Sequence, residues 1–184
     1  MKPAAKTILW GQLCLLVGLA LCAIIRPEGL TTNNGISYYG IFHQTVVPYM
    51  LGLLGAAYFC SRAADKLPSP LNTALRISAL LIVGIVVTPY AVASWVDYLH
   101  TAFGSALFSL QLVLSGWVVW KLKLPWWGIV LFAIEFGAGV LSASYLNPTS
   151  GFLIQSQAIF QFAFGTLLVL GLQKLTLDKT PSTN

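Results

Sequence analysis

Charged residues are scarce in this sequence. They make up 8% of its 184 residues, whereas hydrophobic residues make up 57%. Soluble domains contain about 25% charged residues, so most of this surface is not built to face water. The sequence also lacks a cluster of like charges, because its Lys and Arg residues are scattered over the predicted turns. This scatter argues against a nucleic-acid-binding surface despite the net charge of +5.

Cysteine and histidine are also few. Cys14, Cys22 and Cys60 lie within or at the edge of apolar runs, and none has a CxxC or Cys/His metal spacing. This placement is typical of small apolar residues and not of a disulfide framework. The two histidines, His43 and His100, belong to no HExxH motif. We therefore predict neither a metal site nor a cofactor from the motifs.

Long apolar runs are what the sequence has in abundance. A helix needs about 20 apolar residues to cross a bilayer, and the chain offers six such runs. We predict an all-α fold: a six-transmembrane-helix bundle forming a single integral membrane domain over residues 1–184. The first run is longer than the apolar part of a signal peptide, so we interpret it as a retained helix. The predicted spans are about 7–25, 45–60, 77–95, 101–120, 126–145 and 152–172.

The basic residues predict how the spans are oriented. If the N-terminus is cytoplasmic, nine of the ten Lys and Arg residues fall on the cytoplasmic side and only Arg26 falls outside. Such an excess marks the inner face of a membrane protein. We therefore predict that both termini are cytoplasmic, in a plasma membrane of the bacterial inner type. The inner set is Lys2, Lys6, Arg62, Lys66, Arg76, Lys121, Lys123, Lys174 and Lys179.

Turn-forming residues divide the outer connections. The segment 26–44 contains Pro27, Gly29 and Gly35 and is not expected to be helical throughout. The third predicted span contains Pro89, which should kink it by removing a backbone N–H. The segment 96–100 is predicted to be a tight turn between the third and fourth spans.

Glu135 is the one acidic residue deep within a predicted span. It follows Trp126 by nine residues, which places it roughly 13 Å deep in a hydrocarbon core about 30 Å thick. Counting outward from the turns places it level with Gln111 and Gln161. We expect a protonated Glu135 that donates a hydrogen bond to one of them. The three side chains then form either a packing contact or a proton or cation site.

A second polar group lies at the predicted outer ends of the helices: Tyr38, His43, Asp97 and His100. It can form the mouth of a cavity whose floor is Gln111, Glu135 and Gln161. Alternatively, His43, Asp97 and His100 can ligate a metal or haem, or Asp97 and His100 can act as an acid–base pair. The simplest interpretation is that these are ordinary interfacial residues.

Two short motifs carry a resemblance to a known family. The outer loop ends in Gly35-Ile36-Ser37-Tyr38-Tyr39-Gly40, and a later span is introduced by Asp97-Tyr98-Leu99-His100-Thr101-Ala102-Phe103. With its glycine-bearing second span, the chain resembles a bacterial six-span membrane protein family of unknown function, similar in layout to the DRAM and Frag-type proteins. The resemblance implies a six-helix bundle with the loop packed over its outer mouth and an association with lipid. It implies no catalytic residues.

From these patterns we predict a small multi-pass membrane protein that is not an enzyme. We expect it to bind a lipid-like, amphipathic ligand or a partner membrane protein, including a second copy of itself, through the polar mouth. Candidate ligand-binding residues are Tyr38, His43, Asp97, His100, Gln111, Glu135 and Gln161. The alternatives are a metal- or haem-dependent membrane enzyme using His43, Asp97 and His100, and a proton-coupled transporter using Glu135.

Overall fold

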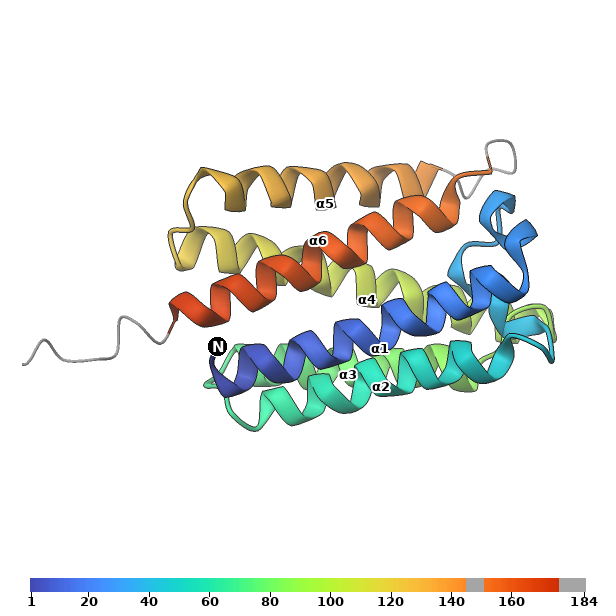
Figure 1. Ribbon diagram of the computed structural model, residues 1–184, viewed down its shortest axis with the longest axis horizontal. Coiled ribbons are helices and arrows are strands. Elements are labelled where there is room, and N and C mark those ends of the chain that lie inside the picture. Colours follow the sequence, from blue (N-terminus) through green and yellow to red (C-terminus); the bar gives the residue numbers. More distant parts are fainter. Residues whose placement is uncertain (145–150, 176–184) are drawn as a thin grey trace, which may run out of the picture.

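The protein is helical throughout the residues that the structure describes. The structure is a computed structural model that describes residues 1–144 and 151–175, and every regular element in these ranges is a helix (Figure 1). Tyr145 at the end of the fifth predicted span, the turn 146–150 and the tail with Lys179 lie outside the described residues. The elements are α1 (Pro3–Ile25), η1 (Pro27–Thr31), η2 (Ile36–Ile41), α2 (Val46–Ala64), α3 (Leu71–Val87), α4 (Ser94–Lys121), α5 (Trp126–Ser144) and α6 (Leu153–Lys174).

Five of these helices, α1, α2, α4, α5 and α6, are long and apolar enough to cross a membrane. This combination of length and composition indicates a membrane protein. The remaining helix, α3, is also apolar but has only 17 residues. It is shorter than predicted from the sequence because of the proline that follows it.

Pro89 ends α3 and does not merely kink it. Thr88 is already the C-cap residue, and its ψ of 72° lies outside the α region, which a following proline disfavours. The prediction of a third span over residues 77–95 was therefore wrong at both ends, since α3 begins at Leu71. The predicted tight turn at 96–100 was also wrong. Those residues lie in the first turns of α4, and the actual turn is 88–93.

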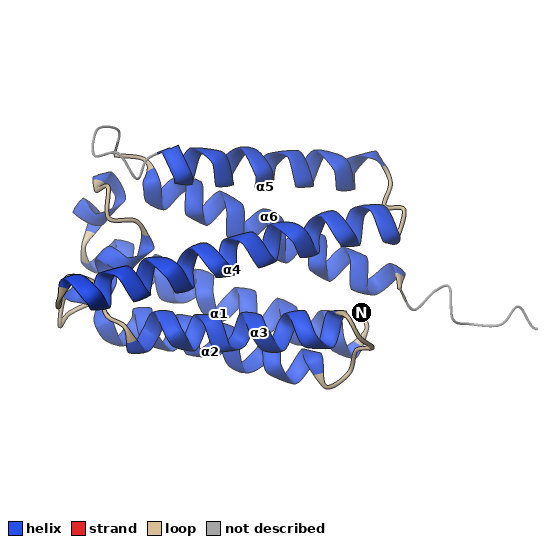
Figure 2. Cartoon of the chain, turned by 180° about the vertical axis from the view of Figure 1, so that it is seen from behind, coloured by secondary structure: helices blue, strands red, loops and turns tan. Residues whose placement is uncertain are grey.

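The connections lie at the two ends of the bundle. The N-terminus, the α2–α3 connection and the α4–α5 connection lie at one end (Figure 1). The short helices η1 and η2 and the α3–α4 turn lie at the other end, which we call the loop end. The view from behind shows the same arrangement (Figure 2). Successive long helices are therefore antiparallel, as short connections require.

Small residues bring α1 and α2 close together. A Cβ atom on Gly18 would lie 2.7 Å from the Pro48 carbonyl oxygen and 2.9 Å from the Gly52 Cα atom. No side chain fits at Gly18 without moving the α2 backbone. Such contacts between small residues are a common way for helices to associate in lipid, where no hydrophobic effect drives the helices together.

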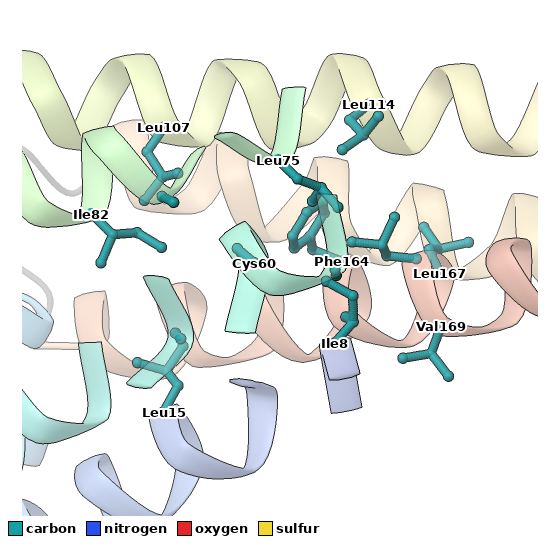
Figure 3. Packing of buried hydrophobic residues seen from close by; sticks show 14 of the residues in the cluster. Ile8, Leu15, Cys60, Leu75, Ile82, Leu107, Leu114, Phe164, Leu167 and Val169 are labelled. Atoms are coloured by element: carbon teal, nitrogen blue, oxygen red, sulfur yellow. The ribbon is translucent and has the colours of Figure 1, made fainter. Parts of the chain in front are cut away.

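The apolar core lies between α6 and the helices α1, α2, α3 and α4. Leu75 of α3, Leu114 of α4 and Phe164 of α6 point into it (Figure 3). By contrast, α5 packs at the edge of the bundle and buries only Gly128, Glu135, Ala138 and Ser142. The polar Glu135 therefore lies on the inward face of the helix that is otherwise most exposed.

Candidate functional site

The loop between α1 and α2, which contains η1 and η2, is joined to the start of α6 by hydrogen bonds. The backbone N–H of Ile36 donates to Gln157 Oε1 over 2.8 Å, and Gln155 Nε2 donates to the Leu30 carbonyl over 2.6 Å. Gly35 has a φ of 62° and lies so close to Gln157 that a Cβ atom would be 2.6 Å from Oε1. A glycine is therefore needed there for both its conformation and its size. These contacts hold η2 over the loop end of the bundle.

The Arg26 side chain makes two further contacts within the same loop. The Arg26 guanidinium lies 2.6 Å from a Glu28 carboxylate oxygen and 3.6 Å from the centroid of the Phe42 ring. A hydrogen bond from its own backbone and the Arg26 side chain lower the pKa of Glu28 below its ordinary value. Nearby, burial raises the pKa of the Tyr39 phenol. The loop is thus a packed structure with its own charge pair.

The central contact of the site joins three elements through His100. The Ser37 Oγ atom of η2 lies 2.6 Å from His100 Nε2, and His100 Nδ1 lies 2.6 Å from the Thr88 carbonyl oxygen at the end of α3. A carbonyl only accepts, so Nδ1 must carry a proton. In the neutral ring Nε2 is then the acceptor, and the Ser37 hydroxyl donates to it. His100 itself is buried.

A cavity of about 210 Å³ opens beside this contact. Met50 of α2 and Ile85 and Val86 of α3 contribute apolar side chains to its lining. Ser37, Tyr49, Tyr90 and His100 contribute polar groups, while Gly40, Val46 and Pro89 complete the lining. The cavity therefore offers apolar volume next to a hydroxyl, an imidazole and two phenols.

The other predicted mouth residues do not join His100 in one group. The Asp97 carboxylate accepts a hydrogen bond from the backbone N–H of Ala91 over 2.7 Å. That bond supports a turn in which Ala91 has a φ of 63°. His43 is exposed, and Tyr38 is buried against Phe42. Within residues 1–144 and 151–175, no three His, Cys, Asp or Glu side chains are grouped closely enough to hold a metal ion.

The hydrogen bonds among Gln111, Glu135 and Gln161 differ from those predicted. Gln111 and Gln161 are level, as predicted, but they bind each other through two amide hydrogen bonds of 2.9 and 3.2 Å. Glu135 donates to neither, so that prediction was wrong. Both of its carboxyl oxygens are buried without a hydrogen-bond partner among the described residues. Ser115, one turn beyond Gln111 on α4, is also buried, and its hydroxyl also has no hydrogen-bond partner among the described residues.

The predicted mouth and floor do not belong to one cavity. The cavity is lined by η2, α2, α3, the 88–93 turn and the start of α4, and none of Gln111, Glu135 and Gln161 lines it. These three lie between α4, α5 and α6 instead. Only His100, of the seven candidate residues, lies on the cavity wall.

Sequence reasoning missed Ser37, Tyr49 and the Thr88 carbonyl. Ser37 was part of a noted motif, but serine is too common in loops for one to stand out. The Thr88 carbonyl becomes available only because Pro89 ends the helix at that point, and the sequence suggested a kink. The signal available in the sequence was Thr88-Pro89 at the end of one helix together with His100 on the next helix.

Comparison with known proteins adds no relative: no family model, curated protein or solved structure matches the chain.

Proposed function

We propose that this is a six-span membrane protein that binds one molecule of a lipid-like, amphipathic ligand in the cavity beneath η2. The single observation that carries the proposal is the cavity's lining, which combines apolar side chains with a few polar groups. An alkyl chain fits against Met50, Ile85 and Val86, and a hydroxyl or ester headgroup fits against Ser37, Tyr49 and His100. Binding sites of this kind combine apolar lining with a few placed polar groups.

The cavity is large enough to hold part of an alkyl chain but too small to hold a whole lipid. A cavity of about 150 Å³ in another protein binds benzene, and this cavity measures about 210 Å³. The remaining chain then extends past the cavity between α2 and α3 toward the bilayer. Such a ligand enters sideways from the membrane and keeps its headgroup at the loop end.

Photolabelling tests this proposal. The probe is a hexadecyl glycerol ether with a diazirine on one of the chain carbons nearest the ether oxygen, which resists hydrolysis and reports whether the first part of the chain lies in the cavity. We expect crosslinks in the 46–50 and 85–90 segments, mapped by mass spectrometry of the protein purified in detergent. Crosslinks spread evenly over α1, α5 and the outer faces of the bundle would contradict the proposal, because they are what nonspecific lipid contact gives.

A pair of substitutions on α3 provides the control. Val86→Trp fills the cavity, whereas Val83→Trp places the same side chain on an exposed face one turn earlier. The first variant should lose the crosslinks in the two segments, and the second should keep them. Equal crosslinking of both variants would show that the chain does not lie in the cavity.

We also propose that the loop end faces outward from a bacterial inner membrane and that both termini are cytoplasmic. Apart from Arg26, the described Lys and Arg residues lie at or near the end that carries the N-terminus, which supports this orientation. Cysteine-accessibility labelling tests it. Cysteines introduced beside Lys66 or Lys121 should react only after the membrane is made permeable. Reaction in intact cells would reverse the topology.

A further inference from the structure

The Ser37–His100 contact has the form of an activated nucleophile. A hydroxyl lies 2.6 Å from one imidazole nitrogen, and the other nitrogen lies 2.6 Å from an acceptor that fixes the ring. Nucleophile, base and orienting group are the three parts shared by enzymes that form acyl-serine intermediates. Here the orienting group is a backbone carbonyl at the C-terminus of α3, in place of a carboxylate. The negative end of a helix dipole stabilises a positive imidazolium.

The position of the pair argues for more than a structural link. A buried link between η2 and α4 has no need of free space, yet both Ser37 and His100 lie on the wall of the cavity. Ser37 is also partly exposed, so an atom placed in the cavity can approach its Oγ. Met50, Ile85 and Val86 line the same cavity and offer an apolar surface to a chain attached to the reacting group.

We propose that Ser37 and His100 form a nucleophile–base pair that cleaves a carboxylic ester of a long-chain acid. This inference rests on the proposed function, because the cavity that binds the chain also presents the ester to Ser37. It differs from the metal-dependent alternative based on His43, Asp97 and His100, because the reaction uses His100 with Ser37 and needs no metal.

The reaction has two steps, the acylation of Ser37 and the hydrolysis of the acyl-serine. Ser37 Oγ attacks the ester carbonyl carbon while its proton moves to His100 Nε2, and a tetrahedral oxyanion forms. The oxyanion collapses, the bond to the alcohol oxygen breaks, and that oxygen takes the proton from Nε2. Water then attacks the acyl-serine in the same way, with Nε2 again holding the proton, and releases the acid and free Ser37.

Tyr49 is the donor available to the oxyanion. Its phenol lines the same cavity as Ser37 and His100. A hydroxyl aimed at the developing negative charge stabilises the transition state more strongly in an apolar site than in water. Tyr90 flanks the imidazole, with ring centroids 6.0 Å apart, and closes the cavity on the other side. The roles are thus nucleophile for Ser37, base for His100 and oxyanion donor for Tyr49.

Covalent labelling with alkyl fluorophosphonates tests the pair. The serine oxygen attacks phosphorus, fluoride leaves and the proton goes to Nε2, so the adduct reports both residues. We expect a single adduct on Ser37 with a hexadecyl probe, no adduct in Ser37→Ala, and unchanged labelling in the control Ser156→Ala. Tyr49→Phe should slow labelling by about 100-fold.

The base requires a variant that keeps the fold. His100→Asn retains an N–H that can reach the Thr88 carbonyl but removes the acceptor from Ser37. We expect it to slow labelling by a factor of about 10² to 10⁴ while its thermal transition stays measurable. Absence of a Ser37 adduct in the folded wild-type protein would overturn the inference, as would labelling of His100→Asn at the wild-type rate.

Probes of different alkyl chain length distinguish a failure of this inference from a failure of the proposed function. A hexadecyl probe that labels Ser37 much faster than an ethyl probe supports both. Equal rates for the two probes would keep the nucleophile–base pair and contradict chain binding in the cavity. Crosslinking of the ether probe in the cavity without any Ser37 adduct would keep chain binding and contradict the pair.

Discussion

Two polar clusters inside this helical protein differ in how their members are satisfied. At the loop end, His100 has a partner at each ring nitrogen and lies beside a cavity. Between α4, α5 and α6, Glu135 is fully buried, its oxygens have no hydrogen-bond partner among the described residues, and it does not line the cavity beside His100. An intramembrane acid is the conventional place to look for function, and here the stronger geometry lies elsewhere.

The difference shows what a functional site requires besides an unusual residue. The loop-end cluster combines a reactive pair, a fixed orientation and space for a ligand. The Glu135 region has the unusual residue, but its neighbouring amides, Gln111 and Gln161, are already paired with each other. We therefore infer that the loop-end cluster acts on a ligand and that the Glu135 region contributes to helix packing. Four changes test this contrast.

The largest effect is expected from His100→Leu. The substitution leaves the buried Thr88 carbonyl without its partner and releases Ser37, so two hydrogen bonds that join η2, α3 and α4 are lost. We expect the free energy of unfolding to fall by about 3 kcal/mol. His100→Asn, which can keep the bond to Thr88, should lose about half as much. Thermal denaturation in detergent measures both, and an unchanged transition in His100→Leu would show that the contact is not structural.

Glu135→Leu should act in the opposite direction. A buried carboxyl without a hydrogen-bond partner costs about 1 to 3 kcal/mol, and leucine has no such requirement. We expect the variant to be more stable than the wild type by part of that amount. The sequence predicts instead that Glu135 donates a hydrogen bond to Gln111 or Gln161, and the loss of such a bond would destabilise the variant. A destabilised Glu135→Leu would therefore favour that prediction and contradict an unpaired Glu135.

Gln111→Leu should lower stability by about 1 kcal/mol, because it leaves Gln161 unpaired in the bundle. The double variant Gln111→Leu/Gln161→Leu should recover most of the loss, since it removes both partners of the pair. A double-mutant cycle measures this coupling. If the two losses simply add, the amide pair seen between α4 and α6 does not form in the membrane.

The smallest effect is expected from acid acting on Glu28. Its folded-state pKa is lowered by a hydrogen bond from its own backbone and by Arg26. The stabilisation from the charged form is therefore present above the unfolded pKa of about 4.3 and is lost as pH falls through the lower folded value. Glu28→Gln should flatten the acid branch of the stability profile slightly. If the wild type and Glu28→Gln lose stability identically as the pH falls, the Arg26–Glu28 pair does not stabilise the loop.

Much of the fold follows from the sequence, and the site follows less completely. Apolar length predicted where the long helices lie, and antiparallel counting correctly placed Gln111 level with Gln161. The same counting predicted a bond from Glu135 to one of these glutamines, whereas the two glutamines bind each other and Glu135 has no hydrogen-bond partner among the described residues. Depth along the helices can be counted from the sequence, but the choice of partner among side chains at one level depends on packing. The contact between Ser37 and His100 could not be predicted from the sequence for another reason. It depends on where Pro89 ends α3 and on how the loop that contains η2 folds back over the bundle.

The most direct test of the central claim is the stabilisation that the hexadecyl glycerol ether gives to three proteins: the wild type, Val86→Trp and Glu135→Leu. A ligand at about 100 times its dissociation constant stabilises the folded state by about 2.7 kcal/mol, which thermal denaturation resolves easily. We predict that the wild type and Glu135→Leu respond equally and that Val86→Trp does not respond. A response abolished by Glu135→Leu and retained by Val86→Trp would place ligand binding at the buried acid and contradict the account.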